Sequence, residues 1–291
     1  MPARDAVRTG RRGRTLAVTR LLAAVLIPFL AIAFVLLYLV PGTTELLFAW
    51  TIAPSLSAML LGSAYAGGIW FFIAVIRSRQ WRTVRRGFPA VLTFATLALV
   101  ATILHWDRFH FGHISFITWV ILYITTPFLV IAAMWRQRGR DDGAATAGEY
   151  LVPGLQRVVL AAIGIVVTVT GIVLFIAPSL FLDAWAWQLT PLTARIVGTV
   201  LTLPGMVNLW MLVDSRWSAF RSIFQAELVS LGLILLALLL ARGDLQWAHP
   251  ITPFVVGGLV LSGIVFGSFY ARCEVLAARG RRAAGPAGTI A

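Results

Sequence analysis

The chain has 291 residues, of which 59% are hydrophobic and 12% are charged, whereas a soluble globular protein has about 25% charged residues. A mean hydropathy of +0.89 excludes an ordinary soluble core and indicates a protein of the lipid bilayer. The formal net charge of +13 comes from arginine without any lysine. Because these arginines cluster where apolar segments end, we interpret them as topology signals and exclude nucleic acid as a partner.

Residues 1–19 form a basic, polar segment, and eight apolar runs follow it. A run of about 18 or more apolar residues with few charges is typical of a membrane-spanning helix, since the hydrocarbon core is about 30 Å thick. In chain order, we predict spans at residues 21–40, 55–76, 88–106, 114–135, 154–177, 191–213, 223–242 and 250–271.

The distribution of arginine predicts how these spans are oriented. Arginines follow the second, fourth, sixth and eighth spans, whereas residues 41–54 and 178–190 contain none. Because positive residues are retained on the cytoplasmic side, we expect both termini in the cytoplasm and the arginine clusters against anionic lipid headgroups. The absence of lysine in a chain rich in alanine, valine, leucine, glycine and arginine is typical of a GC-rich genome. We therefore place the protein in the plasma membrane of a bacterium.

The second half of the chain repeats the first at a shift of 137 residues, which falls to 136 beyond about residue 80. The aligned pairs include Arg20 with Arg157, Pro41 with Pro178, Trp50 with Trp187, Trp81 with Trp217 and His113 with His249. With four spans in each half, both halves keep one orientation, which predicts a parallel tandem duplication of a four-helix unit. Its parts are a first repeat at 20–136, a cytoplasmic linker at 137–153, a second repeat at 154–272 and a cytoplasmic tail at 273–291.

Two arginine-free connections, 41–54 and 178–191, begin and end at proline and carry Trp50 and Trp187. Tryptophan favours the headgroup level, where its ring and its N–H are both satisfied, so we expect both rings at the membrane interface. Small residues four apart predict close helix packing, as for Ala58 and Gly62, Gly258 and Ser262, and Gly263 and Gly267.

The sixth predicted span holds the best candidate for a substrate site. Arg195 and Asn208 flank a break at Pro204 and Gly205, and broken helices can expose backbone groups to a substrate. The alternatives are a simple kink and an Arg195 side chain that reaches the outer headgroups. Trp50 and Trp187 complete the candidate substrate-binding set.

Glu227 is the other charged residue that we place inside a span of the second half. A charge at membrane depth is costly and usually faces a cavity or a partner. Since the seventh span is predicted to start at residue 223, we interpret Glu227 as an inner-interface residue that pairs with Arg221 or with a neighbouring residue.

All four histidines fall at the predicted outer face. His105, His110 and His113 crowd one connection together with Asp107, and His249 is the repeat mate of His113. Imidazole and carboxylate groups suit a divalent transition metal such as zinc, copper or nickel. The alternative is a set of interfacial side chains bonded to water. Haem is disfavoured because its histidines usually lie inside a bundle, so we expect no cofactor.

No nucleotide-binding, hydrolase or metalloprotease motif is present in the sequence. Three functions therefore stay open. The duplicated halves favour transport or binding of a small molecule between them. The sparse polar residues are also typical of an accessory subunit that packs on another membrane protein or on copies of itself. A membrane enzyme or redox protein would use the outer histidine and aspartate cluster.

Overall fold

The computed structural model describes residues 13–141, 143–146 and 148–283, and it is all-α within these ranges. Eight of the described helices are long and apolar enough to cross a membrane. They are α2 (Ala17–Phe34, continued by a π-helical turn to Leu39), α4 (Ser55–Arg77), α5 (Phe88–Leu104), α6 (Ile114–Arg136), α7 (Gly154–Ile176), α8 (Pro191–Trp210), α9 (Trp217–Leu240) and α10 (Ile251–Ala283). The predicted all-α, multi-pass membrane architecture is confirmed. Residues 1–12 of the basic segment, and 284–291 of the tail, lie outside the described residues.

Two helices extend beyond the predicted spans. Helix α9 begins at Trp217 rather than near residue 223, and α10 runs on to Ala283, where we expected a tail from residue 273. In both extensions one helix face is buried, as Trp217 and Phe220 show in α9 and Cys273 shows in α10. Hydropathy detects only the lipid-facing part of a helix, so it misses these amphipathic ends.

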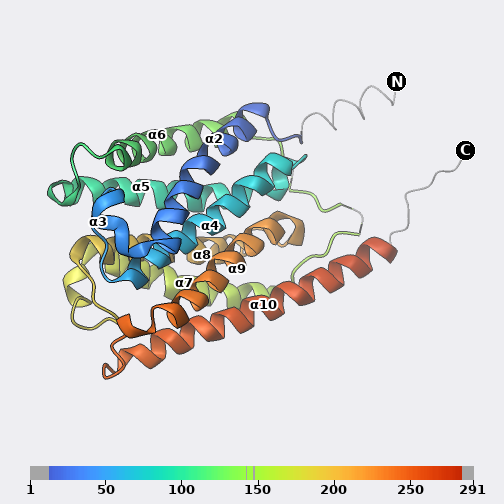
Figure 1. Cartoon of the computed structure of the whole chain (residues 1–291). Coiled ribbons are helices and arrows are strands. Elements are labelled where there is room, and N and C mark those ends of the chain that lie inside the picture. Colours follow the sequence, from blue (N-terminus) through green and yellow to red (C-terminus); the bar gives the residue numbers. More distant parts are fainter. Residues whose placement is uncertain (1–12, 142, 147, 284–291) are drawn as a thin grey trace, which may run out of the picture.

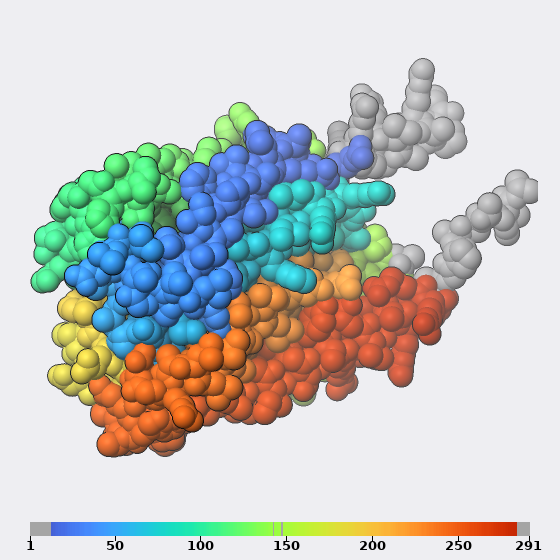
Figure 2. Space-filling model, in the orientation of Figure 1, coloured from blue at the N-terminus to red at the C-terminus, as the bar shows by residue number. Residues whose placement is uncertain are grey.

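The ends of the bundle differ in composition. Figure 1 shows that α2 starts, and α10 finishes, at the same end, where the linker between α6 and α7 also lies. We call this the arginine-rich end, since it carries the arginines of residues 77–86, 216–221 and 272–282. Helix α10 lies along one outer edge of the bundle (Figure 2), and little of it is buried within the protein.

The contacts between helices follow a paired pattern. Helix α2 packs on α4 as α7 packs on α8, and α5 contacts α6 as α9 contacts α10. Between the halves, α4 packs on α9 and α5 on α8. At the arginine-rich end, an isolated antiparallel bridge joins Arg14 to Gln80, and another joins Leu151 to Arg216. The sequence shift that aligns the two halves also relates these bridges.

The closest helix packing occurs at glycines of α7 and α8 that we did not predict for this role. A Cβ added to Gly171 of α7 would lie 2.6 Å from the carbonyl oxygen of Gly198 in α8, and one added to Gly164 would lie 2.8 Å from that of Gly205. Of the predicted positions, Gly62 does contact Tyr38, and Gly263 contacts Leu235. Gly258 and Gly267 face open space.

The two tryptophans that we expected at the membrane interface are buried within the protein. Trp50 is 2% exposed and its ring lies 4.7 Å from that of Trp119. Trp187 is 1% exposed, and its indole N–H donates to the hydroxyl of Ser57 at 2.9 Å. The loops that carry both rings pack against helices, so both rings are shielded by protein, and the Trp50 indole N–H has no hydrogen-bond partner among the described residues. Trp187 thereby ties the second half to α4.

Candidate functional site: a cavity between the halves

A cavity of about 240 Å³ lies within the membrane-spanning part of the bundle. All eight spans contribute to its wall, and most of the lining side chains are apolar. One residue from each span, in chain order, is Leu26, Ala64, Val91, Tyr123, Val167, Val207, Glu227 and Leu259. The cavity therefore belongs to both halves of the chain.

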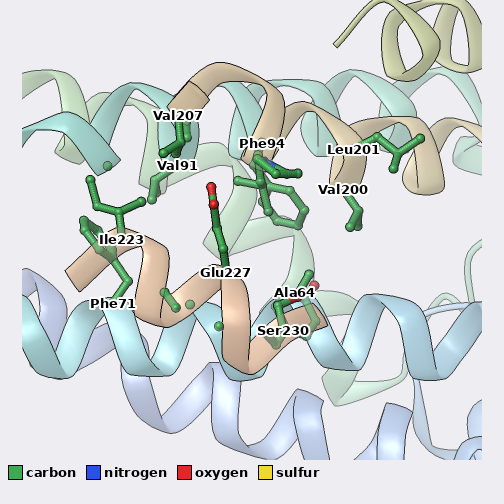
Figure 3. Close-up of a pocket in the computed structure, with 18 of the residues that line it drawn as sticks. Ala64, Phe71, Val91, Phe94, Val200, Leu201, Val207, Ile223, Glu227 and Ser230 are labelled. Atoms are coloured by element: carbon green, nitrogen blue, oxygen red, sulfur yellow. The ribbon is translucent and has the colours of Figure 1, made fainter. Parts of the chain in front are cut away.

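Glu227 places a carboxylate in this apolar space. In Figure 3 its side chain leaves α9 and extends into the region bounded by Val91, Phe94 and Val207. Glu227 as a residue is half-buried, but both carboxylate oxygens are shielded from solvent and have no hydrogen-bond partner within the described part of the chain. A buried polar group without a partner usually marks a functional position or a missing ligand.

The predicted pairing of Glu227 with Arg221 is wrong. Arg221 binds Glu274 of α10 instead, with 2.7 Å between Nη2 and Oε2. Since α9 begins at Trp217, Glu227 lies ten residues along the helix, or about 15 Å at a rise of about 1.5 Å per residue. Because α9 ends at Leu240, Glu227 lies near the middle of this helix.

The other polar groups of the cavity wall are the amide of Asn208 and several hydroxyl groups, which can donate and accept hydrogen bonds. The Oδ1 atom of Asn208 and the hydroxyl of Thr126 are buried, and among the described residues neither has a partner. Tyr65 and Tyr123 also line the cavity, but their hydroxyls satisfy each other at 2.8 Å. The cavity thus offers a carboxylate and an amide oxygen to a ligand that brings its own donors.

A first prediction concerns the stability that the protein loses by burying the Glu227 carboxyl group without a partner. Replacing Glu227 by leucine is expected to raise the free energy of unfolding by about 1–3 kcal/mol, because it removes a buried polar group that has no partner. The measurement is thermal or denaturant unfolding of the purified protein in detergent.

The matched control is Glu274→Leu, which should change stability in the opposite direction. Glu274 accepts hydrogen bonds from Arg221 and from the indole of Trp217, at 2.8 and 2.7 Å. Loss of stability in Glu227→Leu comparable with that in Glu274→Leu would show that the Glu227 carboxylate has a structural partner.

The structure separates the residues of the predicted substrate site. Asn208 lines the cavity, whereas Arg195, Trp50 and Trp187 do not. Arg195 lies at the end of the bundle opposite the arginine-rich end. Its Nη1 is 2.6 Å from Nε2 of His105. Burial, together with the Arg195 charge, lowers the pKa of His105, which favours a neutral imidazole that accepts this hydrogen bond.

The remaining outer residues form separate local contacts. His110 Nε2 lies 3.1 Å from the Thr51 hydroxyl, His249 Nδ1 accepts from a backbone N–H, and Asp107 pairs with the neighbouring Arg108 at 3.1 Å. The His113 ring lies 5.1 Å from that of His110. Within the described ranges, no three histidine, cysteine or acidic side chains come together to hold a metal ion. The expectations on metal, haem and the lack of a cofactor stay predictions.

A buried ionic network at the arginine-rich end was not predicted. Arg216 binds Asp214 and Asp141 at 2.8 Å each, and Arg86 donates to Asp214 at 2.9 Å. Burial alone raises the pKa of Asp214, but hydrogen bonds from Arg216 and Arg86 outweigh it and hold that pKa well below its ordinary value of 3.8. The network joins the turn before α5, the linker and the loop before α9, and so connects the two halves.

Comparison with known proteins gives no further guide to this site. The chain matches no family model, and neither curated proteins nor solved structures show a significant similarity to it.

Proposed function

We propose that this protein binds a small, mainly apolar molecule that carries a protonated amine, and moves it across the membrane through the cavity between the halves. The observation that carries the proposal is the Glu227 carboxylate, which enters an apolar cavity without a hydrogen-bond partner in the described chain. An ammonium group complements it, since charge-assisted hydrogen bonds are strong where water is excluded.

The size of the cavity limits the ligand. A volume of about 240 Å³ exceeds the roughly 150 Å³ of a cavity that holds benzene, and it falls below the roughly 300–1,000 Å³ of sites for drug-sized ligands. A single aromatic ring with a short amine tail satisfies both limits. Asn208 then supplies a second acceptor.

Transport, rather than storage, is favoured by the two-part construction. The bridge at Arg14 and Gln80 recurs at Leu151 and Arg216, which supports the predicted internal repeat. In transporters built from two related halves, the substrate site lies between them near the middle of the bilayer, and the halves rock around it. The cavity wall, with residues from every span, suits such movement.

We also propose that the arginine-rich end faces the cytoplasm of a bacterial cell, because positive residues are retained on that side. The test is a set of topology reporters. Fused after Ala283, a reporter that works only in the cytoplasm should be active, and one that works only after export should be inactive. Insertion at Gly112 should give the opposite result. The reverse pattern would contradict the orientation.

The binding experiment compares two ligands of similar shape, 2-phenylethylamine and 2-phenylethanol. The amine should bind the wild-type protein about 10- to 100-fold more tightly than the alcohol, since a hydrogen bond to a charged group contributes about 1.5–3 kcal/mol. Ligand-dependent shifts of the unfolding temperature measure both affinities. Glu227→Gln should remove the preference for the amine and keep the shape of the site.

The control is Glu45→Gln, which removes a carboxylate from an exposed position outside the cavity. This variant should retain the full preference for the amine. Equal affinity for amine and alcohol in the wild type, or an unchanged preference in Glu227→Gln, would contradict the proposal.

Transport is tested separately with isotope-labelled 2-phenylethylamine, which keeps the N–H donors that the site requires, and the exchange through protein-free liposomes is subtracted. Proteoliposomes should exchange it between compartments, and the Glu227→Gln variant should not. If a stoichiometric membrane protein instead co-purifies with the chain and the liposomes show no exchange, the accessory-subunit hypothesis replaces this one.

A further inference from the structure

A second pocket, of about 780 Å³, opens at the arginine-rich end and is separate from the cavity that holds Glu227. Its wall combines the end of α4, the loop that follows, the linker, the start of α9 and the end of α10. The charged lining residues are Arg77, Arg82, Glu149, Arg221 and Arg281. The pocket therefore lies between the two halves, as the cavity does, but at the level where the spans end.

The carboxylates near this pocket are already neutralised. Glu149 binds Arg82 at 3.0 Å and accepts further hydrogen bonds from Ser218 and Thr146. Its pKa lies below the ordinary value because these groups outweigh the effect of burial. The charge of Glu149 is therefore compensated by Arg82.

Glu274 also neutralises an arginine of this pocket, since it pairs with Arg221 of the lining. Arg77 and Arg281 are the other two arginines of the lining. Among the described residues, neither lies within ion-pair distance of a carboxylate. Two arginines on different helices therefore give the pocket an uncompensated positive charge. Trp70, which is 45% exposed, lines the same pocket two helical turns before Arg77, as is typical of the aromatic belt beside headgroups.

We infer that this pocket binds a phosphate group between Arg77 and Arg281. Guanidinium groups match phosphate oxygens in geometry and can donate two parallel hydrogen bonds. Basic pockets between spans on the cytoplasmic side are also where anionic lipid headgroups bind. The phosphate can come from an anionic phospholipid or from free phosphate, and the experiment separates these sources.

The experiment uses the full-length protein in nanodiscs with equal amounts of phosphatidylcholine and phosphatidylglycerol. After release into mild detergent, native mass spectrometry counts the retained lipid of each kind. The Arg77→Gln/Arg281→Gln variant should bind phosphatidylglycerol about 25-fold more weakly, because one arginine near an anionic lipid contributes about 1 kcal/mol, or about fivefold. A parallel titration with inorganic phosphate, read as a shift of the unfolding temperature, tests the free ion.

The matched control is Arg79→Gln/Arg279→Gln, which removes two exposed arginines from the same segments but outside the pocket. It should retain phosphatidylglycerol to within about twofold, since neither side chain lines the pocket and exposed charges are screened by salt. Phosphate stabilisation that only the pocket variant loses, without lipid retention, supports the site and identifies free phosphate as its ligand. Equal retention in both variants, or equal loss in both, overturns the inference.

Discussion

Replacing Asp214 by alanine is expected to lower the free energy of unfolding by about 3–5 kcal/mol, because it breaks the buried ion pair with Arg216 and also removes the carboxylate that Arg86 binds. Asp214 is 5% exposed and Arg216 is 3% exposed, so water cannot replace the lost carboxylate. Arg86 also donates to Asp214, at 2.9 and 3.0 Å. The measurement is denaturant unfolding in detergent, with the change in midpoint converted to a free energy.

The control for this prediction is Asp107→Ala. Asp107 pairs with Arg108 at 3.1 Å, but the two side chains are 74% and 72% exposed, and exposed ion pairs contribute little. The unfolding midpoint of the Asp107→Ala variant should match that of the wild type. Equal midpoints for the Asp214 and Asp107 variants would contradict a stabilising role for the network.

The same network predicts how stability depends on pH. The pKa of Asp214 is lower in the folded protein than its ordinary value of 3.8, so the folded state favours the ionised form. The stabilisation is therefore complete above about pH 4 and is lost as the pH falls further. Unfolding temperatures measured between pH 7 and 3 should fall at the acidic end in the wild type, and less steeply in Asp214→Asn.

Replacing Gly171 by alanine is the second change with a large expected effect. The new methyl group would lie 2.6 Å from the Gly198 carbonyl oxygen and 3.1 Å from Cβ of Leu201. Because the closer atom belongs to a helix backbone, α7 and α8 must separate, and overpacking of this kind costs about 1–3 kcal/mol. Unfolding temperature in detergent provides the measurement.

Gly258→Ala on α10 is the matched control, since nothing lies within 4 Å of the added methyl group. Alanine is a better helix former than glycine by about 0.5–1 kcal/mol, so this variant should be as stable as the wild type or more so. If Gly171→Ala shows the same gain, the close contact of α7 and α8 is not as described.

Hydropathy predicted the framework well because it reports directly on depth in the bilayer. The second span, expected at 55–76, is Ser55–Arg77 in the structure. The ends of α9 and α10 were missed, since an amphipathic helix that continues past the lipid has no continuous apolar run. The error at α9 placed Glu227 near the interface instead of deep in the bundle.

The neglected signal for Glu227 was its spacing from Arg221. Residues six apart do not share a helix face, whereas residues three or four apart do. Arg221 was therefore a poor partner for Glu227, and the structure pairs it with Glu274. A lone carboxylate within an apolar helix was thus the better indication of a site than the histidine-rich connection.

The glycines also left a signal that our pattern of four-residue spacings did not include. Gly164 and Gly171 stand seven residues apart on α7, and Gly198 and Gly205 stand seven apart on α8. Antiparallel packing brings Gly171 to Gly198, and Gly164 to Gly205. The Asp141–Arg216 contact left no comparable signal, because 75 residues separate its partners and only the fold brings them together.

Chemical labelling with dicyclohexylcarbodiimide tests most directly whether an unpaired carboxyl group lies in the apolar cavity. This reagent partitions into lipid and reacts with carboxyl groups that hold a proton in apolar surroundings. Peptide mapping by mass spectrometry should find the label on Glu227 and not on the ion-paired Glu274, and 2-phenylethylamine should suppress it. An unlabelled Glu227, or a label that the amine leaves unchanged, would contradict a ligand site built around this residue.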